Sequence, residues 1–342
     1  MIKRDVIAIG STVWDTYFET NFEIAKWPKA PLGKAIIIPF GEKFGAENIY
    51  STLGGNAANA SITFARQGLR TGIFTKIGHD VTGEALRRIW KKERIDARLV
   101  EVSDLPTGSS VLLLQNGDRS IITYHGAIDE FTLRGVNLNN LRSKWWYVSL
   151  PGDSYKTFDR LLAYARKNKI KVALNPSFKH LSGAGKKKLL TQLKLISFLV
   201  VNGEEASAIT GIPIKKERDV FKKLDELVSG IVAVTYGSRG VTVSDGKFMY
   251  KAGIFKNKKL IDRTGAGDAF GSGFVSGLIR KKEKLGDNGP KVENVEYAIR
   301  LASANSTLVV EHIGASEGAI TKRQFDTLSR FGTLKITKSR VK

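Results

Sequence analysis

The segment 262–270, DRTGAGDAF, places two glycines, an alanine and a threonine around one acid, directly before an apolar run. The run predicts a helix over 266–282, and two interpretations fit its start. In the first, Thr264 is an ordinary N-cap and Asp268 is a first-turn acid that complements the helix dipole. In the second, an anion site beside Asp268 is formed by the backbone N–H groups of Gly265, Ala266 and Gly267. A short glycine motif leaves both open, so the rest of the chain must decide.

The bulk composition is that of a folded protein with a large core. The chain has 342 residues, 42% of them hydrophobic, which is enough for one large domain or two smaller ones. It contains no cysteine, so disulfides, thiolate nucleophiles and cysteine-bound metals are excluded. The first residues lack the apolar stretch of a signal peptide, and no apolar run reaches the ~20 residues that span a bilayer. We therefore expect a cytoplasmic protein with no membrane contact.

The formal net charge of +22 is the one unusual bulk property. An excess of this size is compatible with nucleic-acid binding, an anionic substrate or an unusual cytoplasm. The basic residues cluster at 86–98, 183–190, 279–285 and the carboxyl terminus, mostly on helical patterns with acids among them. Solvated helix faces explain this better than a nucleic-acid surface, because no zinc-finger, basic-zipper or RNA-recognition motif accompanies it. Nucleic-acid binding remains the minor alternative.

Short β-rich runs alternate with helical patterns along most of the chain. This alternation predicts βαβ units, and the nearly all-apolar runs suit strands of a mostly parallel sheet buried on both faces. The fold class is therefore α/β. The predicted strands are 5–10, 71–77, 145–150, 170–175, 196–202 and 231–237. The predicted helices are 56–68, 82–94, 155–168, 185–194, 203–210, 217–228, 266–282 and 292–310.

Two regions interrupt the alternation. Residues 12–52 carry β-like fragments, and residues 107–126 contain two β runs joined by NGD, a hairpin signal. We expect both to form a small second β layer on a domain that covers residues 1–330, and we expect the basic tail 331–342 to fray. In open α/β sheets, ligands bind beyond the carboxyl ends of the strands. The loops that should hold the function are GSTVWD, NPS, NGEEAS, TYGSRG and TGAGDAF.

A second glycine cluster, Gly54 and Gly55, precedes a predicted helix whose first turns carry Asn56 and Asn59. Gly-Gly-Asn is a routine helix start. Two exposed amides beside a glycine pair also suit a polyhydroxylated ligand, because an amide both donates and accepts hydrogen bonds. The sequence has no P-loop and no dinucleotide GxGxxG, and its four histidines lack zinc-ligand spacing. A bound metal should therefore be hard and oxygen-ligated.

Four segments together resemble the ribokinase family of sugar and nucleoside kinases. GGNAANASITFARQG…IGHDVTGEAL and DRTGAGDAFGSGFVSGL look like its two signature regions, in the right order. Between them, VNGEEA resembles the family's Asn-x-x-Glu motif, and VTYGSRGV resembles its nucleotide-binding loop. The similarity runs over residues 5–320. It implies an ATP-dependent phosphotransferase with a three-layer α/β/α fold, a mostly parallel central sheet and a small β lid from 12–52 and 107–126.

The resemblance assigns roles to the polar loops. Asp268 would be the general base that takes the proton of the acceptor hydroxyl, and Gly265–Gly267 would form the anion hole for the phosphoryl group in flight. Asn202 and Glu205 would organise Mg²⁺ through water around the phosphates of ATP. From the residues alone, NGEEAS describes a helix cap followed by exposed acids. The nucleotide site would be lined by Thr235, Gly237, Ser238, Gly240 and, near the adenine, Asn305.

On the acceptor side, the resemblance implies that Asp15 and Asn59 bind sugar hydroxyls, beside Gly54, Gly55 and Asn56. A monovalent-cation site for K⁺ would be formed by Asp262, Thr264 and the backbone near Gly314. The chain has Val13 and Pro151 where ribokinase proper has an asparagine and a glutamate, so ribose itself is not implied. The acceptor stays open between a sugar-like primary alcohol and a nucleoside. A lid-mediated homodimer follows from the resemblance alone, and a regulatory protein on an inactive kinase fold is the alternative from another class.

Overall fold

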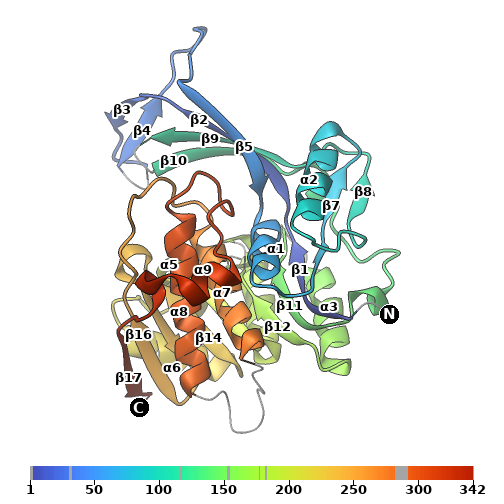
Figure 1. The fold of residues 1–342 in the computed structure, drawn as a ribbon, viewed down its shortest axis with the longest axis vertical. Helices are drawn as coiled ribbons and strands as arrows, with labels where there is room; N and C mark the ends of the chain where they lie inside the picture. Colours follow the sequence, from blue (N-terminus) through green and yellow to red (C-terminus); the bar gives the residue numbers. More distant parts are fainter. Residues whose placement is uncertain are drawn as a thin grey trace.

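The computed structural model describes residues 3–341 apart from 31–32, 116–117, 152–154, 177, 182 and 282–291. Within these residues the centre is a nine-stranded sheet of order β17-β16-β15-β14-β13-β12-β11-β1-β6 (Figure 1). The parallel strands are β6 (Thr71–Phe74), β1 (Arg4–Gly10), β11 (Ser143–Ser149), β12 (Lys171–Leu174), β13 (Phe198–Asn202) and β14 (Ile231–Thr235). Antiparallel strands extend one side, namely β15 (Val241–Ser244), β16 (Phe248–Ala252) and β17 (Ile336–Arg340).

Helices cover both faces of the sheet and bury its apolar side chains. One face packs against α1 (Asn56–Arg66), α7 (Ala266–Arg280) and α8 (Val292–Val309), with Phe64, Phe198 and Phe274 in the shared core. The other face packs against α3 (Tyr155–Lys167), α4 (Gly183–Gln192), α5 (Gly203–Thr210) and α6 (Glu217–Leu227). The result is the expected three-layer α/β/α arrangement. No helix in the described part of the chain is long and apolar enough to cross a membrane.

A separate sheet of order β10-β9-β2-β5 lies above the carboxyl ends of the parallel strands (Figure 1). Its strands are β2 (Val13–Glu19), β5 (Asn48–Gly54), β9 (Ser109–Gln115) and β10 (Asp118–Tyr124), and a hairpin of β3 (Glu23–Lys26) and β4 (Lys34–Ile37) continues it. Apart from the last two residues of β5, these strands fall within 12–52 and 107–126, so we call this sheet the lid sheet. The remaining short elements are β7 (Lys76–Gly78), β8 (Glu101–Ser103), α2 (Val81–Lys92) and α9 (Lys322–Thr327).

The predicted fraying of the tail 331–342 is wrong for the five residues of β17. Residues Ile336–Arg340 form β17, which pairs antiparallel with β16 in the register Ala252↔Ile336 to Phe248↔Arg340. Without β17, strand β16 would leave its backbone donors and acceptors unpaired at the sheet edge. Ile336 also packs against the core on the α7 side. Basic composition therefore did not prevent pairing, since charged side chains are common on edge strands.

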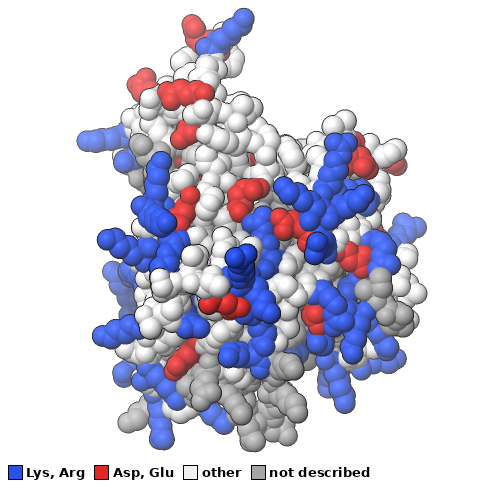
Figure 2. Space-filling view, viewed as in Figure 1, with Lys and Arg blue, Asp and Glu red and all other residues white. Residues whose placement is uncertain are grey.

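The basic side chains are dispersed over the surface. Figure 2 shows Lys and Arg spread over much of the face in view, with Asp and Glu between them rather than in one uninterrupted basic band. Thirteen ion pairs among the described residues take up some of these cations. On this face, the distribution favours solvated helix surfaces over a dedicated nucleic-acid groove.

Candidate active site

Helix α7 begins on a glycine with left-handed backbone geometry. Gly265 is the N-cap, with φ +74°, and a Cβ there would lie 2.5 Å from the Cβ of Ala315, so a larger residue is excluded. Of the two interpretations of this helix start, the one with Thr264 as N-cap is wrong: the Thr264 hydroxyl donates to Asp262 Oδ1 at 2.6 Å instead. The N–H groups of the first turn have no partner within the helix, and open space surrounds the α-carbon of Gly267. These N–H groups are suited to an anion.

Asp268 lies in this first turn and is held by two amides. Asn59 Nδ2 donates to its Oδ2 at 3.1 Å, and Asn175 Nδ2 donates to its Oδ1 at 2.8 Å. Only 8% of Asp268 is exposed, and this burial raises its pKa to about 6. The amides lower the pKa, whereas the charges of Glu205 and Asp15 raise it further. The carboxylate is thus fixed in direction and titrates close to neutrality, as a general base requires.

Asn175 is the site residue that the sequence analysis missed. It follows β12 in the loop NPS, which was placed among the functional loops, but no role was given to its side chain. Its amide donates to Asp268, and it also lies 3.3 Å from the Tyr147 hydroxyl on the neighbouring strand β11. The available signal was its position at the carboxyl end of a buried parallel strand.

Asp15 lies on β2 of the lid sheet, opposite the end of β5. It is 5% exposed, and a Cβ on Gly54 would come within 2.1 Å of its Oδ2, so only glycine fits beside it. Burial raises the pKa of Asp15 to about 6, the Ser110 hydroxyl lowers it, and the charge of Asp262 raises it. A buried carboxylate of this kind is stabilised when ligand hydroxyls donate to it.

The start of α1 brings two asparagines to the same region. Gly55 is its N-cap with φ +92°, and a Cβ there would lie 2.6 Å from the Ser11 carbonyl oxygen. The side chain of Asn56 donates to Ser149 Oγ at 3.1 Å. Asn59 is buried, and among the described residues nothing donates to its Oδ1. A buried oxygen that accepts no hydrogen bond lowers the stability of the protein, unless a ligand hydroxyl or a water donates to it.

Asn202 and Glu205 form a capping box at the start of α5. Asn202 Oδ1 accepts from the Glu205 N–H at 2.9 Å, and Glu205 Oε2 accepts from the Asn202 N–H at 2.8 Å. The helix-cap interpretation of NGEEAS therefore holds, and burial raises the pKa of Glu205. The charge of Glu205 also acts on Asp268. The pair thus caps α5, and Glu205 lies close enough to Asp268 for its charge to raise the pKa of that carboxyl.

The predicted nucleotide loop is a tight turn between β14 and β15. Thr235 ends β14, the segment Gly237–Arg239 forms a single 3₁₀ turn that includes Ser238, and the Tyr236 N–H donates to the Gly240 carbonyl at 2.8 Å. Gly240 has φ +89°, and a Cβ there would lie 2.0 Å from the Ala252 carbonyl oxygen. Gly237 and Ser238 are exposed in the turn that follows β14, whose last residue, Thr235, pairs with Asn202 on β13.

Asn305, which was expected to line the nucleotide site near the adenine, does not line an open site in the structure. Its side chain is fully buried on α8. The Nδ2 donates to the Ala269 carbonyl at 2.8 Å and to Thr63 Oγ1 at 3.1 Å, and the Oδ1 accepts from the Ile320 N–H at 2.8 Å. All the usual bonding capacity of the amide is used inside the protein. Asn305 therefore joins α8 to α7 and α1.

Asp262, Thr264 and Gly314 come together beneath the start of α7. Asp262 is 1% exposed, its Oδ1 accepts from the N–H and hydroxyl of Thr264, and its Oδ2 accepts from the Gly314 N–H at 3.2 Å. Its charge acts on Asp15. These hydrogen-bond donors to the carboxylate are neutral, and a buried carboxylate without a cation is costly. The cluster is thus chemically suited to a bound cation.

Four acidic side chains gather where these loops meet. The charges of Asp15, Glu205, Asp262 and Asp268 act on one another, directly or through a shared neighbour. Among the described residues, no three acids or histidines form a ready metal cage. Arg263 pairs with Asp118 on β10, which joins the loop before α7 to the lid sheet. Such a site has negative side chains, oxygen donors and a helix N-terminus, and it is adapted to a phosphate ligand that arrives with cations.

The family follows from comparison with known proteins. The sequence profile of pfkB family carbohydrate kinases matches residues 36–322. This range covers most of the chain, so the protein belongs to that family, and the resemblance drawn from its motifs is confirmed.

Individual relatives agree with this assignment. The ribokinase of Haemophilus influenzae is 27% identical over 295 residues, which is 83% of this chain and 89% of that protein. The cytidine kinase of Thermococcus kodakarensis is 27% identical over 233 residues, which is 66% of this chain and 80% of that one. Among solved structures, ribokinase of Arabidopsis thaliana complexed with ribose and ATP superposes with a TM-score of 0.76 at 21% identity, covering 97% of this chain and 100% of that one. The protein is therefore a carbohydrate kinase with the ribokinase fold.

Proposed function

We propose that the protein transfers the γ-phosphoryl group of ATP to a hydroxyl of a sugar or sugar-like molecule, with Asp268 as the general base. The observation that carries this proposal is the start of α7. It combines a carboxylate held by two amides, a pKa raised to about 6 and the N–H groups of a helix start in one turn. The Asp268 carboxylate accepts the proton of the acceptor hydroxyl, whose oxygen forms a bond to the γ-phosphorus. The bond between that phosphorus and the β,γ-bridging oxygen breaks, and ADP leaves.

The backbone stabilises the charge that develops during transfer. The N–H groups of Gly265, Ala266 and Gly267 lie at the positive end of the α7 dipole, where the equatorial oxygens of the phosphoryl group would lie. The absence of side chains at the two glycines lets these donors come close. They are fixed before the reaction, so no reorganisation opposes the transfer.

Cations balance the phosphates in this proposal. Mg²⁺, when bound with ATP, neutralises charge on the β- and γ-phosphates. Glu205, whose charge acts on Asp268, and Asn202 would hold this Mg²⁺ through water, since their side-chain oxygens suit a hard cation. The loop Thr235–Gly240 would support the nucleotide from the neighbouring strand. Asp262, Thr264 and the backbone at Gly314 would hold K⁺ beneath α7 and offset the buried charge of Asp262.

The acceptor would lie between Asp15 and Asp268. Asp15 and Asn59 Oδ1 both accept hydrogen bonds, so they favour a ligand with several hydroxyls. A nucleoside is the second candidate, because it presents the same ribose hydroxyls and because Val13 replaces a polar contact expected for free ribose. The similarity to a cytidine kinase favours keeping it. The lid sheet would close over either acceptor and exclude water, which otherwise competes for the phosphoryl group.

The outer face of the lid sheet supports a homodimer. The register of β5, β2, β9 and β10 places Tyr17 and Leu112 on the face toward Ile313. Strand residues alternate between faces, so the opposite face carries Phe18, Ile49, Val111, Leu113, Ile122 and Tyr124. Ile49, Ile122 and Tyr124 are 61%, 66% and 53% exposed. An apolar sheet face of this kind is typical of a protein interface, and we propose that a second copy covers it.

The acceptor is identified by a turnover assay. ADP release is measured with ATP and Mg²⁺, with and without K⁺, against a panel of sugars and nucleosides. We expect one acceptor to stimulate ADP release strongly and to appear as a phosphorylated product. If no acceptor on the panel stimulates release while ATP still binds, the alternative of a regulatory protein on a kinase fold gains support. Salt-sensitive binding to random DNA at physiological ionic strength would then point to nucleic acid.

A further inference from the structure

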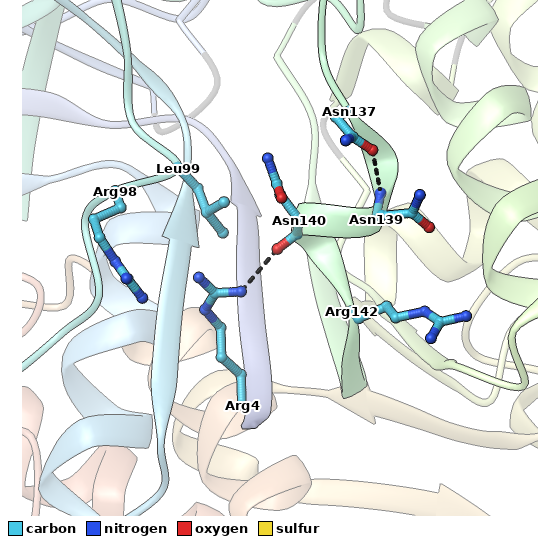
Figure 3. A pocket seen from close by; sticks show the side chains of 7 residues that line it. All are labelled: Arg4, Arg98, Leu99, Asn137, Asn139, Asn140 and Arg142. Carbon is cyan, nitrogen blue, oxygen red and sulfur yellow. Dashed lines mark hydrogen bonds between the residues drawn. The ribbon is translucent and has the colours of Figure 1, made fainter. Parts of the chain in front are cut away.

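A second polar pocket lies at the opposite end of the central sheet. Its volume is about 490 Å³. Strand β1 begins in this pocket, at Arg4, and ends at Gly10, shortly before β2, the strand that carries Asp15. The pocket is therefore separated from the candidate active site by the length of the sheet. It is lined by Arg4, Arg98, Leu99, Asn137, Asn139, Asn140 and Arg142 (Figure 3).

Two arginines of this pocket share a single carboxylate. Arg4 donates to Asp96 Oδ2 from Nε at 2.9 Å and from Nη2 at 2.6 Å. Arg98 donates to Asp96 Oδ1 from Nε at 2.8 Å and to Oδ2 from Nη2 at 2.7 Å. The side chain of Arg4 is 9% exposed, so its charge is largely removed from water. Because two guanidinium groups share one carboxylate, the site keeps a net positive charge. The largely buried Arg4 cation therefore favours a further negative charge nearby.

Neighbouring groups add to this positive excess. The Arg142 guanidinium donates to a neutral oxygen, Asn168 Oδ1, at 3.0 Å. Hydrogen bonds from Arg98, together with those from Arg4, hold the pKa of Asp96 well below its usual range, so this acid is already fully ionised and cannot contribute more negative charge. The residues that line the pocket therefore include three arginines: Arg4 and Arg98 share the Asp96 carboxylate, and the Arg142 guanidinium points away from them toward Asn168 (Figure 3).

The wall opposite Arg98 is polar and fixed by the backbone. The Asn140 carbonyl accepts from Arg4 Nη1 at 2.7 Å, and Asn137 Oδ1 accepts from the Asn139 N–H at 3.0 Å (Figure 3). These contacts hold the segment 137–140 in a 3₁₀ turn beside the arginines. The Asn137 and Asn140 side chains are exposed there, and amide groups of this kind hydrogen-bond to hydroxyls.

We propose that this pocket binds a small phosphorylated polyol, such as a sugar phosphate. Planar guanidinium groups match phosphate oxygens in pairs, which suits the arginines to the anionic end of such a ligand. The asparagine amides suit its hydroxyls. The volume lies in the range of small-ligand sites. The inference does not rest on the proposed reaction, because no residue of the pocket belongs to the candidate active site.

The test is a calorimetric titration of the full chain with glucose 6-phosphate, with glucose as the uncharged comparison. An unreactive ATP analogue is present at saturation, so that the phosphate-binding groups at α7 are occupied. Arg98→Ala/Arg142→Ala is the test variant, and both residues are exposed, so it retains the buried Arg4. Arg218→Ala/Arg323→Ala removes the same charge from exposed positions outside the pocket.

We expect a saturable site for glucose 6-phosphate that depends on the pocket arginines, whereas any glucose bound at the acceptor site should bind equally to the native chain and to the test variant. The test variant should bind at least about tenfold more weakly, since charge-assisted hydrogen bonds are lost, and the control variant should bind within about twofold of the native chain. The proposal is overturned by the absence of saturable binding up to about 10 mM. It is also overturned by equal weakening in both variants, or by a short RNA that displaces the sugar phosphate at physiological salt, since RNA would then be the occupant.

Discussion

Asn175 provides a sharp test of how Asp268 is held. Replacing Asn175 with leucine keeps a similar volume but removes the donor that lies 2.8 Å from Asp268 Oδ1. A hydrogen bond to a charged group contributes about 1.5–3 kcal/mol, and one pKa unit corresponds to about 1.4 kcal/mol. The lost bond favoured the ionised form, so the pKa of Asp268 should rise from about 6 by at least about 1 unit. At pH 7 the ionised fraction would fall from about nine-tenths to about half or less.

The assay is acceptor-dependent ATP turnover between about pH 5 and pH 9. We expect the acidic limb of the kcat/KM profile to move upward by about 1 unit in Asn175→Leu, with most of the rate recovered at the alkaline end. Asn168→Ala, at the end of α3, is the control and should leave the profile unchanged. An unshifted acidic limb in Asn175→Leu, with or without a uniform loss of rate, would refute the assigned role of this amide.

Three further predictions concern stability, the acceptor pocket and assembly. Burial raises the pKa of Asp268 above its unfolded value, so ionisation of this carboxyl costs stability as pH rises from about 4 to about 6. Asp268→Asn should therefore raise the free energy of unfolding at pH 7, measured by urea denaturation, by up to about 3 kcal/mol. The same substitution should give no gain in stability at pH 3.5. Gly54→Ala places a Cβ 2.1 Å from Asp15 Oδ2, so it should raise the KM for the acceptor about tenfold or more and leave the KM for ATP unchanged. Gly45→Ala adds a Cβ in open space and should change neither KM. Ile122→Asp puts a charge on the outer face of the lid sheet and should convert a dimer to a monomer in light scattering; a native chain that is already monomeric would contradict the proposed interface.

Local sequence patterns were sufficient to predict the layers and much of the candidate site. The runs of apolar residues predicted the parallel strands because strands covered on both faces need little polar alternation. The glycines before Asp268 and the Asn-x-x-Glu spacing at Asn202 are short-range signals of helix starts, and both positions begin helices in the structure. Such signals can be recognised in the sequence without knowledge of the tertiary fold, because the interactions behind them lie within one or two helical turns.

Tertiary contacts account for what the sequence did not reveal. The contact of Asn175 with Asp268 depends on β12 and α7 meeting across 93 positions, which no local pattern encodes. Asn305 was predicted to be a ligand-facing amide, but it is buried by hydrogen bonds to α1 and α7 and by one from the Ile320 N–H. The basic tail was predicted to fray because its composition is polar, yet residues 336–340 pair with the edge of β16 as strand β17. In each case the partner, rather than the residue itself, decides the outcome.

The central claim is that Asp268 is the base for phosphoryl transfer to a hydroxyl. The most direct test is the acceptor-dependent kcat of Asp268→Asn relative to the native chain, after calorimetry has shown that the variant still binds ATP and the acceptor. The account predicts a loss of at least about a hundredfold in kcat at pH 8, with both binding constants little changed. A variant that binds both ligands and retains kcat within about tenfold would contradict the assignment of Asp268 as the base.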